Sequence, residues 1–177
     1  MNFNLQPTLQ NEIVKIRPLQ LADFESLYAV ASDPEIWEQH PNKERYKKDV
    51  FEIFFKGAIE SKGAFIIYDA TSNKIIGSTR FYDFNAENSE VLIGYTFLAK
   101  AYWGSVFNQA TKKLLMEYAF QYVDAILFHI GANNIRSQKA IAKLGAIKID
   151  EILVAYYGEP EKLNFIYQIK KESWVNL

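Results

Sequence analysis

The clearest hydrophobic pattern of this 177-residue chain runs over positions 90–122. Residues from Glu90 to Leu98 alternate with a period of two, which predicts a β-strand. Its two faces are expected to carry Val91, Ile93, Tyr95 and Phe97 on one side and Glu90, Leu92, Gly94 and Thr96 on the other. Farther along, apolar residues recur at helical spacing, at Leu114, Leu115, Tyr118, Ala119 and Tyr122. The chain is therefore expected to turn from strand to helix between Gly104 and Asn108.

A strand–loop–helix junction with a glycine is a candidate anion site. The backbone N–H groups in the first turn of a helix have no partner within the helix, and the helix dipole places partial positive charge there. Many junctions of this kind bind nothing. Taken alone, the pattern around Gly104 therefore indicates a phosphate site only weakly.

The remaining elements follow from the same two periods. Strands are predicted over 12–18, 64–69, 74–82, 125–130, 146–156 and 163–170, and helices over 21–32, 46–61 and 135–144. Turns are predicted at 71–73, 84–89 and 158–160, and residues 1–11 receive no element. The order is β-α-α-β-β-β-α-β-α-β-β, with no linker or internal repeat.

This order predicts an α/β fold, with one domain over residues 1–177. Three consecutive strands followed by a strand–helix–strand crossover imply a mixed, mostly antiparallel twisted sheet with helices on both faces. The strands at 90–98 and 125–130 are joined by the central helix and should be parallel. We expect this central pair to splay apart, leaving a cleft at the carboxyl ends of the strands, where ligands usually bind.

Composition narrows the function classes. The formal net charge of −1 argues against nucleic acid or an anionic membrane as the main partner. The chain has no cysteine, which excludes disulfides, zinc–thiolate sites and cysteine nucleophiles, and two histidines cannot form a histidine-rich metal site. No apolar run resembles a signal peptide or reaches membrane-spanning length, so a cytoplasmic location is expected, with no membrane partner and no metal.

Two motifs, IGYTFLAKAYWGSVFNQ and NNIRSQKAIAKLGA, together with the order of elements, resemble the GNAT superfamily of N-acetyltransferases. Within the superfamily, the chain looks most like the RimJ/RimL-like branch. The opening IRPLQLADFESLY matches the first strand and helix of the GNAT family. The resemblance covers nearly the whole chain and implies the GNAT-like form of the fold predicted above. The second motif is the more specific one, with Asn134, Ser137 and the run Lys143-Leu144-Gly145.

The resemblance implies that acetyl-CoA is the co-substrate. The loop and first helical turn would wrap its pyrophosphate, the edge of the central strand would hydrogen-bond its pantetheine arm, Asn134 would hold a pantetheine amide, and Trp103 would form a wall of the groove. The expected cofactor-binding residues are Tyr95, Thr96, Phe97, Leu98, Trp103, Gly104, Ser105, Val106, Phe107, Asn108, Gln109, Asn134 and Ser137. The family loop usually reads Gly-x-Gly, and Val106 replaces the second glycine. A valine is harmless there if its φ is negative, but obstructs a position that needs a positive φ.

Acetyl transfer to an amine needs a neutral amine, a stabilised oxyanion and a proton for the departing thiolate. The resemblance gives a backbone N–H near Phe97, where the strand of this family commonly carries a β-bulge, for the oxyanion, and it gives Ser137 as the acid. Ser137 could instead only cap the helix that follows Asn134. Relatives often carry a glutamate where this chain has Leu92. Glu90, two residues earlier on the same strand face, is the candidate base. The alternative that Glu90 is a solvated carboxylate at the start of the strand, without a catalytic role, is at least equally good.

The acceptor is expected to enter over the loop between the first two helices and the turn after the strand at 74–82. The candidate substrate-binding residues are Trp37, His40, Tyr82, Asp83 and Phe84, and Tyr82, Asp83 and His40 are further candidates for the base. Their aromatic character and the carboxylate of Asp83 favour an amine, either a protein N-terminus or a small molecule. A non-catalytic acyl-CoA-binding domain and a structural α/β domain remain alternatives, and an apolar edge strand could support a homodimer.

Overall fold

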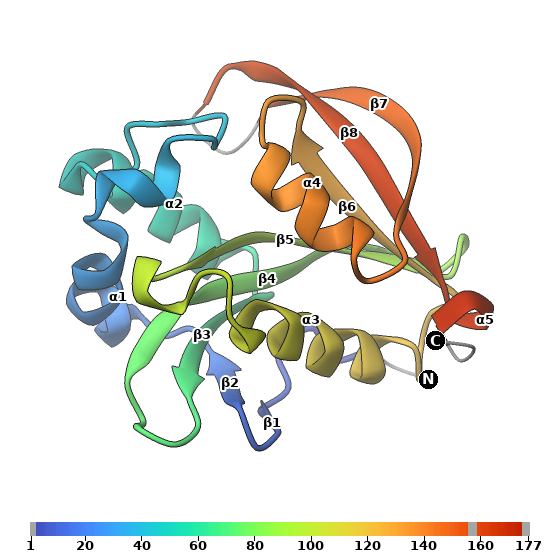
Figure 1. Ribbon diagram of the computed structural model, residues 1–177, viewed down its shortest axis with the longest axis horizontal. Coiled ribbons are helices and arrows are strands. Elements are labelled where there is room, and N and C mark those ends of the chain that lie inside the picture. The colour runs from blue at the N-terminus through green and yellow to red at the C-terminus, as the bar shows by residue number, and fades with distance from the viewer. Residues whose placement is uncertain (1–2, 156–158, 175–177) are drawn as a thin grey trace.

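The computed structural model describes residues 3–155 and 159–174. These residues form an eight-stranded sheet in the order β1-β2-β3-β4-β5-β6-β8-β7 (Figure 1). Its strands are β1 Leu9–Gln10, β2 Val14–Pro18, β3 Ala64–Asp69, β4 Ile75–Asn85, β5 Glu90–Leu98, β6 Ala125–Gly131, β7 Ile147–Ala155 and β8 Glu161–Lys170. Within the described ranges every neighbouring pair is antiparallel except β5 and β6, which are parallel. The predicted mixed, mostly antiparallel sheet is confirmed.

Helices cover both faces of the sheet, as predicted. The α-helices are α1 Phe24–Ala31, α2 Lys48–Glu60, α3 Val106–Ala119, α4 Ile135–Ala142 and α5 Lys171–Trp174, and short 3-10 turns are η1 Leu21–Asp23, η2 Pro34–Trp37 and η3 Lys100–Tyr102. Figure 1 shows α1 and α2 grouped together, while α3 runs along the other side of the strands. No helix in the described ranges is long and apolar enough to cross a membrane.

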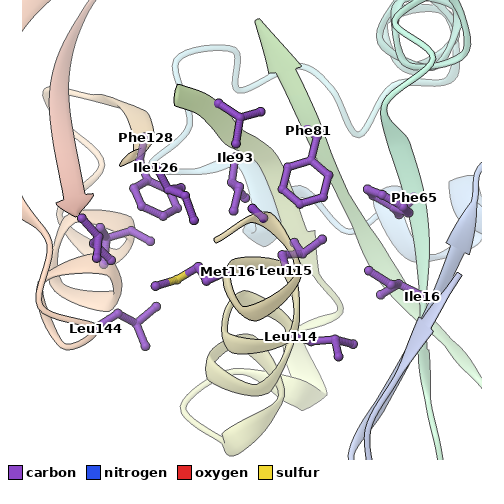
Figure 2. Close-up of a cluster of buried hydrophobic side chains, with 14 of the residues drawn as sticks. Ile16, Phe65, Phe81, Ile93, Leu114, Leu115, Met116, Ile126, Phe128 and Leu144 are labelled. Atoms are coloured by element: carbon purple, nitrogen blue, oxygen red, sulfur yellow. The ribbon is translucent and has the colours of Figure 1, made fainter. Parts of the chain in front are cut away.

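The two faces of the sheet carry two separate hydrophobic clusters. The larger cluster packs α3 and α4 against the sheet, and Figure 2 shows Leu115 and Met116 of α3 among strand side chains such as Ile93 and Ile126. The smaller cluster packs α1 and α2 on the opposite face and is rich in aromatic rings, including Trp37. The central strands are therefore buried on both sides.

Most predicted elements are present, and the differences lie at their ends. The turn predicted at 84–89 is shorter, because β4 continues to Asn85. The lead-in is not structureless: it contributes β1, and Phe3 is buried with its ring 5.3 Å from that of Tyr122. The end of the strand predicted at 146–156 and part of the turn at 158–160 lie outside the described residues.

The regular alternation predicted for β5 is wrong beyond Ile93. Phe97 pairs with Ser78 and Gly94 pairs with Arg80, so β5 carries one extra residue, and Tyr95 has a φ of 52°. The bulge reverses the faces that follow it: Val91 and Ile93 face the α3 cluster, but Phe97 belongs to the α1–α2 cluster. A β-bulge close to Phe97 was expected from the family resemblance.

The central parallel pair separates early. The ladder between β5 and β6 holds only three residue pairs, from Glu90 with Ala125 to Leu92 with Leu127. Beyond Leu92, β6 stays paired with β8 while β5 stays paired with β4. The carboxyl-terminal half of β5 therefore has one edge without a strand partner in the part of the chain that the structure describes.

Candidate functional site

A cavity of about 640 Å³ lies where β5 and β6 separate. It is lined by the end of β5, the loop and first turns of α3, the end of β6, the residues of α4 and the segment around η2. The predicted cofactor-site residues that line it are Tyr95, Thr96, Phe97, Leu98, Trp103, Gly104, Ser105, Val106, Asn108, Gln109, Asn134 and Ser137. The structure thus brings the two sequence motifs, at residues 93–109 and 133–146, to one cavity.

The loop before α3 leaves open space beside its backbone at Gly104. Gly104 adopts a φ of +65°, and a Cβ at this position would meet no atom within 4 Å. The N-cap Ser105 makes no side-chain hydrogen bond to the first turn; its Oγ donates to the carbonyl of Tyr102 at 2.5 Å. Val106 is the first helical residue, is exposed and does not have a positive φ, so it needs no glycine.

The start of α4 forms the opposite wall. Asn134 is buried and caps the helix, because its Oδ1 accepts a hydrogen bond from the Ser137 N–H at 3.1 Å. The alternative that Ser137 is the capping residue is therefore wrong. The Ser137 hydroxyl makes no hydrogen bond within the described residues and lines the cavity. Arg136 stacks on Trp103, with its guanidinium carbon 4.0 Å from the ring centroid.

Aromatic side chains line the other end of the cavity. Trp37, His40 and Tyr82, three of the predicted substrate-site residues, are among them. Nη1 of Arg45 lies 3.2 Å from Nε2 of His40, and since arginine only donates, that nitrogen accepts. Burial, followed by the positive charges of Arg45 and Arg136, holds the pKa of His40 well below its usual value. A neutral ring whose lone pair already accepts a hydrogen bond is a poor candidate for the base.

Two buried arginines support this end. Nε and Nη2 of Arg45 donate to one carboxylate oxygen of Glu159, at 2.9 and 2.5 Å. The guanidinium of Arg80 lies 3.9 Å from the ring centroid of Tyr95, and burial lowers the pKa of Arg80 to about 10. Nε of Arg80 is buried without a hydrogen-bond partner. Burial also raises the pKa of Tyr95, against the lowering effect of Arg80.

Four predicted site residues do not line the cavity. Glu90 is at the start of β5, where it pairs with Ala125 in the parallel ladder. The prediction used strand alternation, which gives the face of a residue but not its distance from the cavity along the strand. Phe84 packs on Phe3, with ring centroids 5.1 Å apart, and Asp83 lies beside it, exposed, with a φ of 48°. Phe107 turns away to pack against Tyr102, at 4.7 Å between ring centroids.

The sequence analysis missed Lys112, which reaches the cavity from α3. Only 4% of Lys112 is exposed, and its Nζ donates to Oγ1 of Thr96 at 2.5 Å. Burial lowers the pKa of Lys112 to about 7. The available signal was helical spacing, since Lys112 falls on the apolar side of the helix with Leu115, Met116 and Ala119.

The charged residues that line the cavity are all basic. Among the described residues no aspartate or glutamate lines it, whereas Lys112, Arg136, Lys139 and Lys143 do. Within the described ranges no group of three or more histidine or carboxylate side chains could hold a metal ion. The arrangement therefore suits an anionic ligand at the α3–α4 end and an uncharged or aromatic group at the other end.

Comparison with known proteins agrees with this geometry. The model of the family described as "Acetyltransferase (GNAT) domain" matches residues 14–147. A GCN5-related N-acetyltransferase from Brucella melitensis is similar in structure, with a TM-score of 0.83 at 16% identity over 96% of this chain and 81% of that one. A search of curated proteins gave no match.

Two similar structures contain CoA or a CoA derivative. Spermidine N-acetyltransferase from Vibrio cholerae, in complex with CoA and spermine, has a TM-score of 0.69 at 14% identity over 94% of this chain and 100% of that one. RimJ from Mycobacterium smegmatis, in complex with CoA-disulfide, has a TM-score of 0.71 at 14% identity over 94% and 87%. At these identities the likeness extends to the fold alone.

Proposed function

This chain belongs to the GNAT acetyltransferase family, and we propose that it transfers an acetyl group from acetyl-CoA to a primary amine. The observation that carries the proposal is the convergence at one cavity of three features: the edge of β5 that has no strand partner among the described residues, the open turn at Gly104 and the start of α4. A pantetheine arm can pair with a free strand edge, and a pyrophosphate can accept hydrogen bonds from a helix N-terminus.

The residues present fit this co-substrate. The open space at the Gly104 Cβ position lets phosphate oxygens approach the backbone, and Val106 does not obstruct the turn. Lys139 of α4 and Lys143, which directly follows the helix, place positive charge at the same cavity. Bound acetyl-CoA would supply a thioester, whose carbonyl carbon is open to attack by a neutral amine.

We assign the chain's own groups as follows. A backbone N–H at the β5 bulge, near Phe97, stabilises the oxyanion, because the bulge and the splay free this strand edge from pairing. The Ser137 hydroxyl, which has no other partner among the described residues, hydrogen-bonds the departing thiolate as a candidate acid. We do not retain Glu90 as the base, because it lies outside the cavity. The acceptor must then arrive neutral or lose its proton to water.

The charge of the cavity favours some amines over others. A polyamine carries several positive charges and needs carboxylates to bind, but no carboxylate in the described ranges lines the cavity. A protein or peptide N-terminus carries one amine with a pKa of about 8, so a sizeable fraction is neutral near pH 7.5. We therefore propose a peptide N-terminus or a small aromatic amine as the acceptor, which is compatible with a RimJ/RimL-like role.

The second candidate is a domain that binds acyl-CoA without turnover. Leu92, where relatives often carry a glutamate, has a hydrocarbon side chain that cannot accept a proton, and the cavity offers no carboxylate from the described residues to replace it. This alternative predicts CoA binding without release of thiol when amines are added.

Two measurements test the proposal. Thermal unfolding with acetyl-CoA at ~100 times its dissociation constant should show ~2.7 kcal/mol of added stability. A screen of peptides and small amines should then show acceptor-dependent release of free CoA thiol, at a rate that rises with pH as the amine is deprotonated. Binding without thiol release would favour the non-catalytic alternative. Absence of any shift would contradict both.

A further inference from the structure

Lys112 is a buried amine with one hydrogen-bond acceptor. Its Nζ donates to Thr96 Oγ1 at 2.5 Å and lies 5.7 Å from the ring centroid of Phe128. Thr96 Oγ1 also lies 2.8 Å from Thr79 Oγ1 and 3.3 Å from the carbonyl of Gly94. Lys112 forms no ion pair with a described residue, so further N–H donors remain available toward the cavity.

The bulge in β5 creates this contact. With regular alternation, Thr96 would share the face of Gly94 and point away from α3. The extra residue, with Tyr95 at positive φ, turns Thr96 toward α3 and Lys112. The same bulge interrupts the β4–β5 ladder next to Phe97, near which we place the backbone N–H that stabilises the oxyanion. The amine of Lys112 therefore binds Thr96, the residue directly before Phe97, near which we place the oxyanion.

A buried lysine without a carboxylate is unfavourable for folding, because water no longer solvates its charge. The groups that face it from β4, β5 and β6 are Thr79, Thr96 and Phe128, none of them acidic, and the other ionisable residues lining the cavity are His40, Tyr82, Tyr95, Tyr102, His129, Arg136, Lys139 and Lys143. An apolar side chain would fill this position on the helix face at lower cost. A residue that opposes stability at a binding cavity is a candidate for a functional role.

We propose that Lys112 is a catalytic residue whose side-chain ammonium contacts the thioester sulfur and stabilises the CoA thiolate as the acyl group leaves. The inference rests on the acetyl-CoA chemistry proposed above and extends it to a residue outside both sequence motifs. Ser137 contributes a neutral hydrogen bond to the same sulfur, and Lys112 contributes the charge.

The proton balance is complete without another reactant. The neutral amine forms a bond to the thioester carbon, and the C–S bond breaks with its electron pair passing to sulfur. The Lys112 ammonium gives a proton to this thiolate, which leaves as the thiol. The proton lost by the acceptor nitrogen passes to water, and the neutral Lys112 amine regains one from water. The lowered pKa of Lys112 makes both proton transfers accessible near neutral pH.

The test titrates the thiol of CoA bound to the protein, and therefore needs no acceptor amine. The fraction of thiolate is followed by its ultraviolet absorption as pH is raised, for the wild type, Lys112→Met and Lys113→Met. Lys113 is the matched control, since it lies next on α3 but is exposed and pairs with Glu117. Affinity for desulfo-CoA, which lacks the sulfur, is measured in parallel.

We expect the wild type and Lys113→Met to lower the pKa of the bound thiol, so that about tenfold more thiolate is present than in Lys112→Met at the same pH. All three proteins should bind desulfo-CoA with similar affinity. Equal thiol titrations in the wild type and Lys112→Met would overturn the inference, as would loss of desulfo-CoA binding in Lys112→Met alone. Failure of the wild type to bind CoA at all would overturn the proposed function itself.

Discussion

At the scale of single residues, the buried charge of Lys112 should lower the stability of the folded chain while it assists catalysis. Lys112→Met keeps an unbranched side chain that is one atom shorter and removes a charge that burial disfavours. We expect the variant to be more stable than the wild type at pH 7 and to have a lower kcat with a similar KM for acetyl-CoA. Urea unfolding and steady-state kinetics measure the two effects, and a large loss of stability would contradict the first.

The same residue predicts how stability depends on pH. The folded pKa of Lys112, about 7, lies below its ordinary value of 10.5, so between these values the unfolded chain binds more protons than the folded one. The free energy of unfolding therefore rises with pH between about 7 and 10.5, by up to ~1.4 kcal/mol per pH unit, and it decreases again as pH falls toward 7. Unfolding measured from pH 7 to 9 should show this slope in the wild type and a smaller one in Lys112→Met.

Ser137 and Glu90 form a second comparison at this scale. Ser137→Ala removes a hydroxyl that faces the cavity, and should lower kcat about 10- to 100-fold, as expected for one hydrogen bond to a charged group. Glu90→Gln changes a residue outside the cavity and should leave kcat within about twofold. Equal effects in the two variants would contradict the placement of the site.

At the scale of elements, the turn before α3 can be tested separately from the helix. Gly104→Ala introduces a Cβ into open space, so its cost is the positive φ alone, about 1 kcal/mol. Gly145→Ala is the matched control, because Gly145 also has a positive φ, 84°, but does not line the cavity. Both variants should lose similar stability in thermal unfolding, and only Gly104→Ala should weaken acetyl-CoA binding.

The sequence predicted the elements well where the period of apolar residues was regular. The strands at 64–69 and 90–98 have the predicted bounds, because the first is a short apolar run between Gly63 and the turn at 71–73, and the second begins directly after the polar turn before Glu90. The bulge could not be read from periodicity, since an extra residue changes the face of Phe97 without changing the composition of β5. The contact between Thr96 and Lys112 depends on that bulge and was missed with it.

The candidate site was predicted in outline, but not in all of its residues. The family resemblance assigned the loop at Gly104 and the start of α4 to one CoA site, and the cavity contains both. Strand parity gave the face of Glu90 but not its distance from the splay, so its assignment as a base is not retained. Asp83 and Phe84 were placed by sequence proximity to Tyr82. Strand alternation puts Asp83 on the opposite face, and the register shift between Tyr82 and Asn85, with Asp83 at positive φ, accompanies the packing of Phe84 on Phe3.

At the scale of the whole molecule, the ion pair between Arg45 and Glu159 joins segments 114 residues apart. Both side chains are at least nine-tenths buried, so Glu159→Gln leaves the Arg45 charge without its carboxylate and should cost about 3 kcal/mol. Glu151→Gln breaks the exposed pair with Lys148 and should cost less than about 1 kcal/mol. Urea unfolding of both variants would measure the difference, and equal midpoints would show that the buried pair contributes little.

We expect the early separation of β5 and β6 to let the sheet open as two units. One comprises β1 to β5, the other comprises β6, β8 and β7, and the ladder between them holds three residue pairs. Amide hydrogens in the second unit should therefore exchange through openings that leave the first unit folded, at a lower free energy than global unfolding. A ligand that bridges the gap would couple the units, so slowed exchange throughout β6 and β8 should accompany its binding.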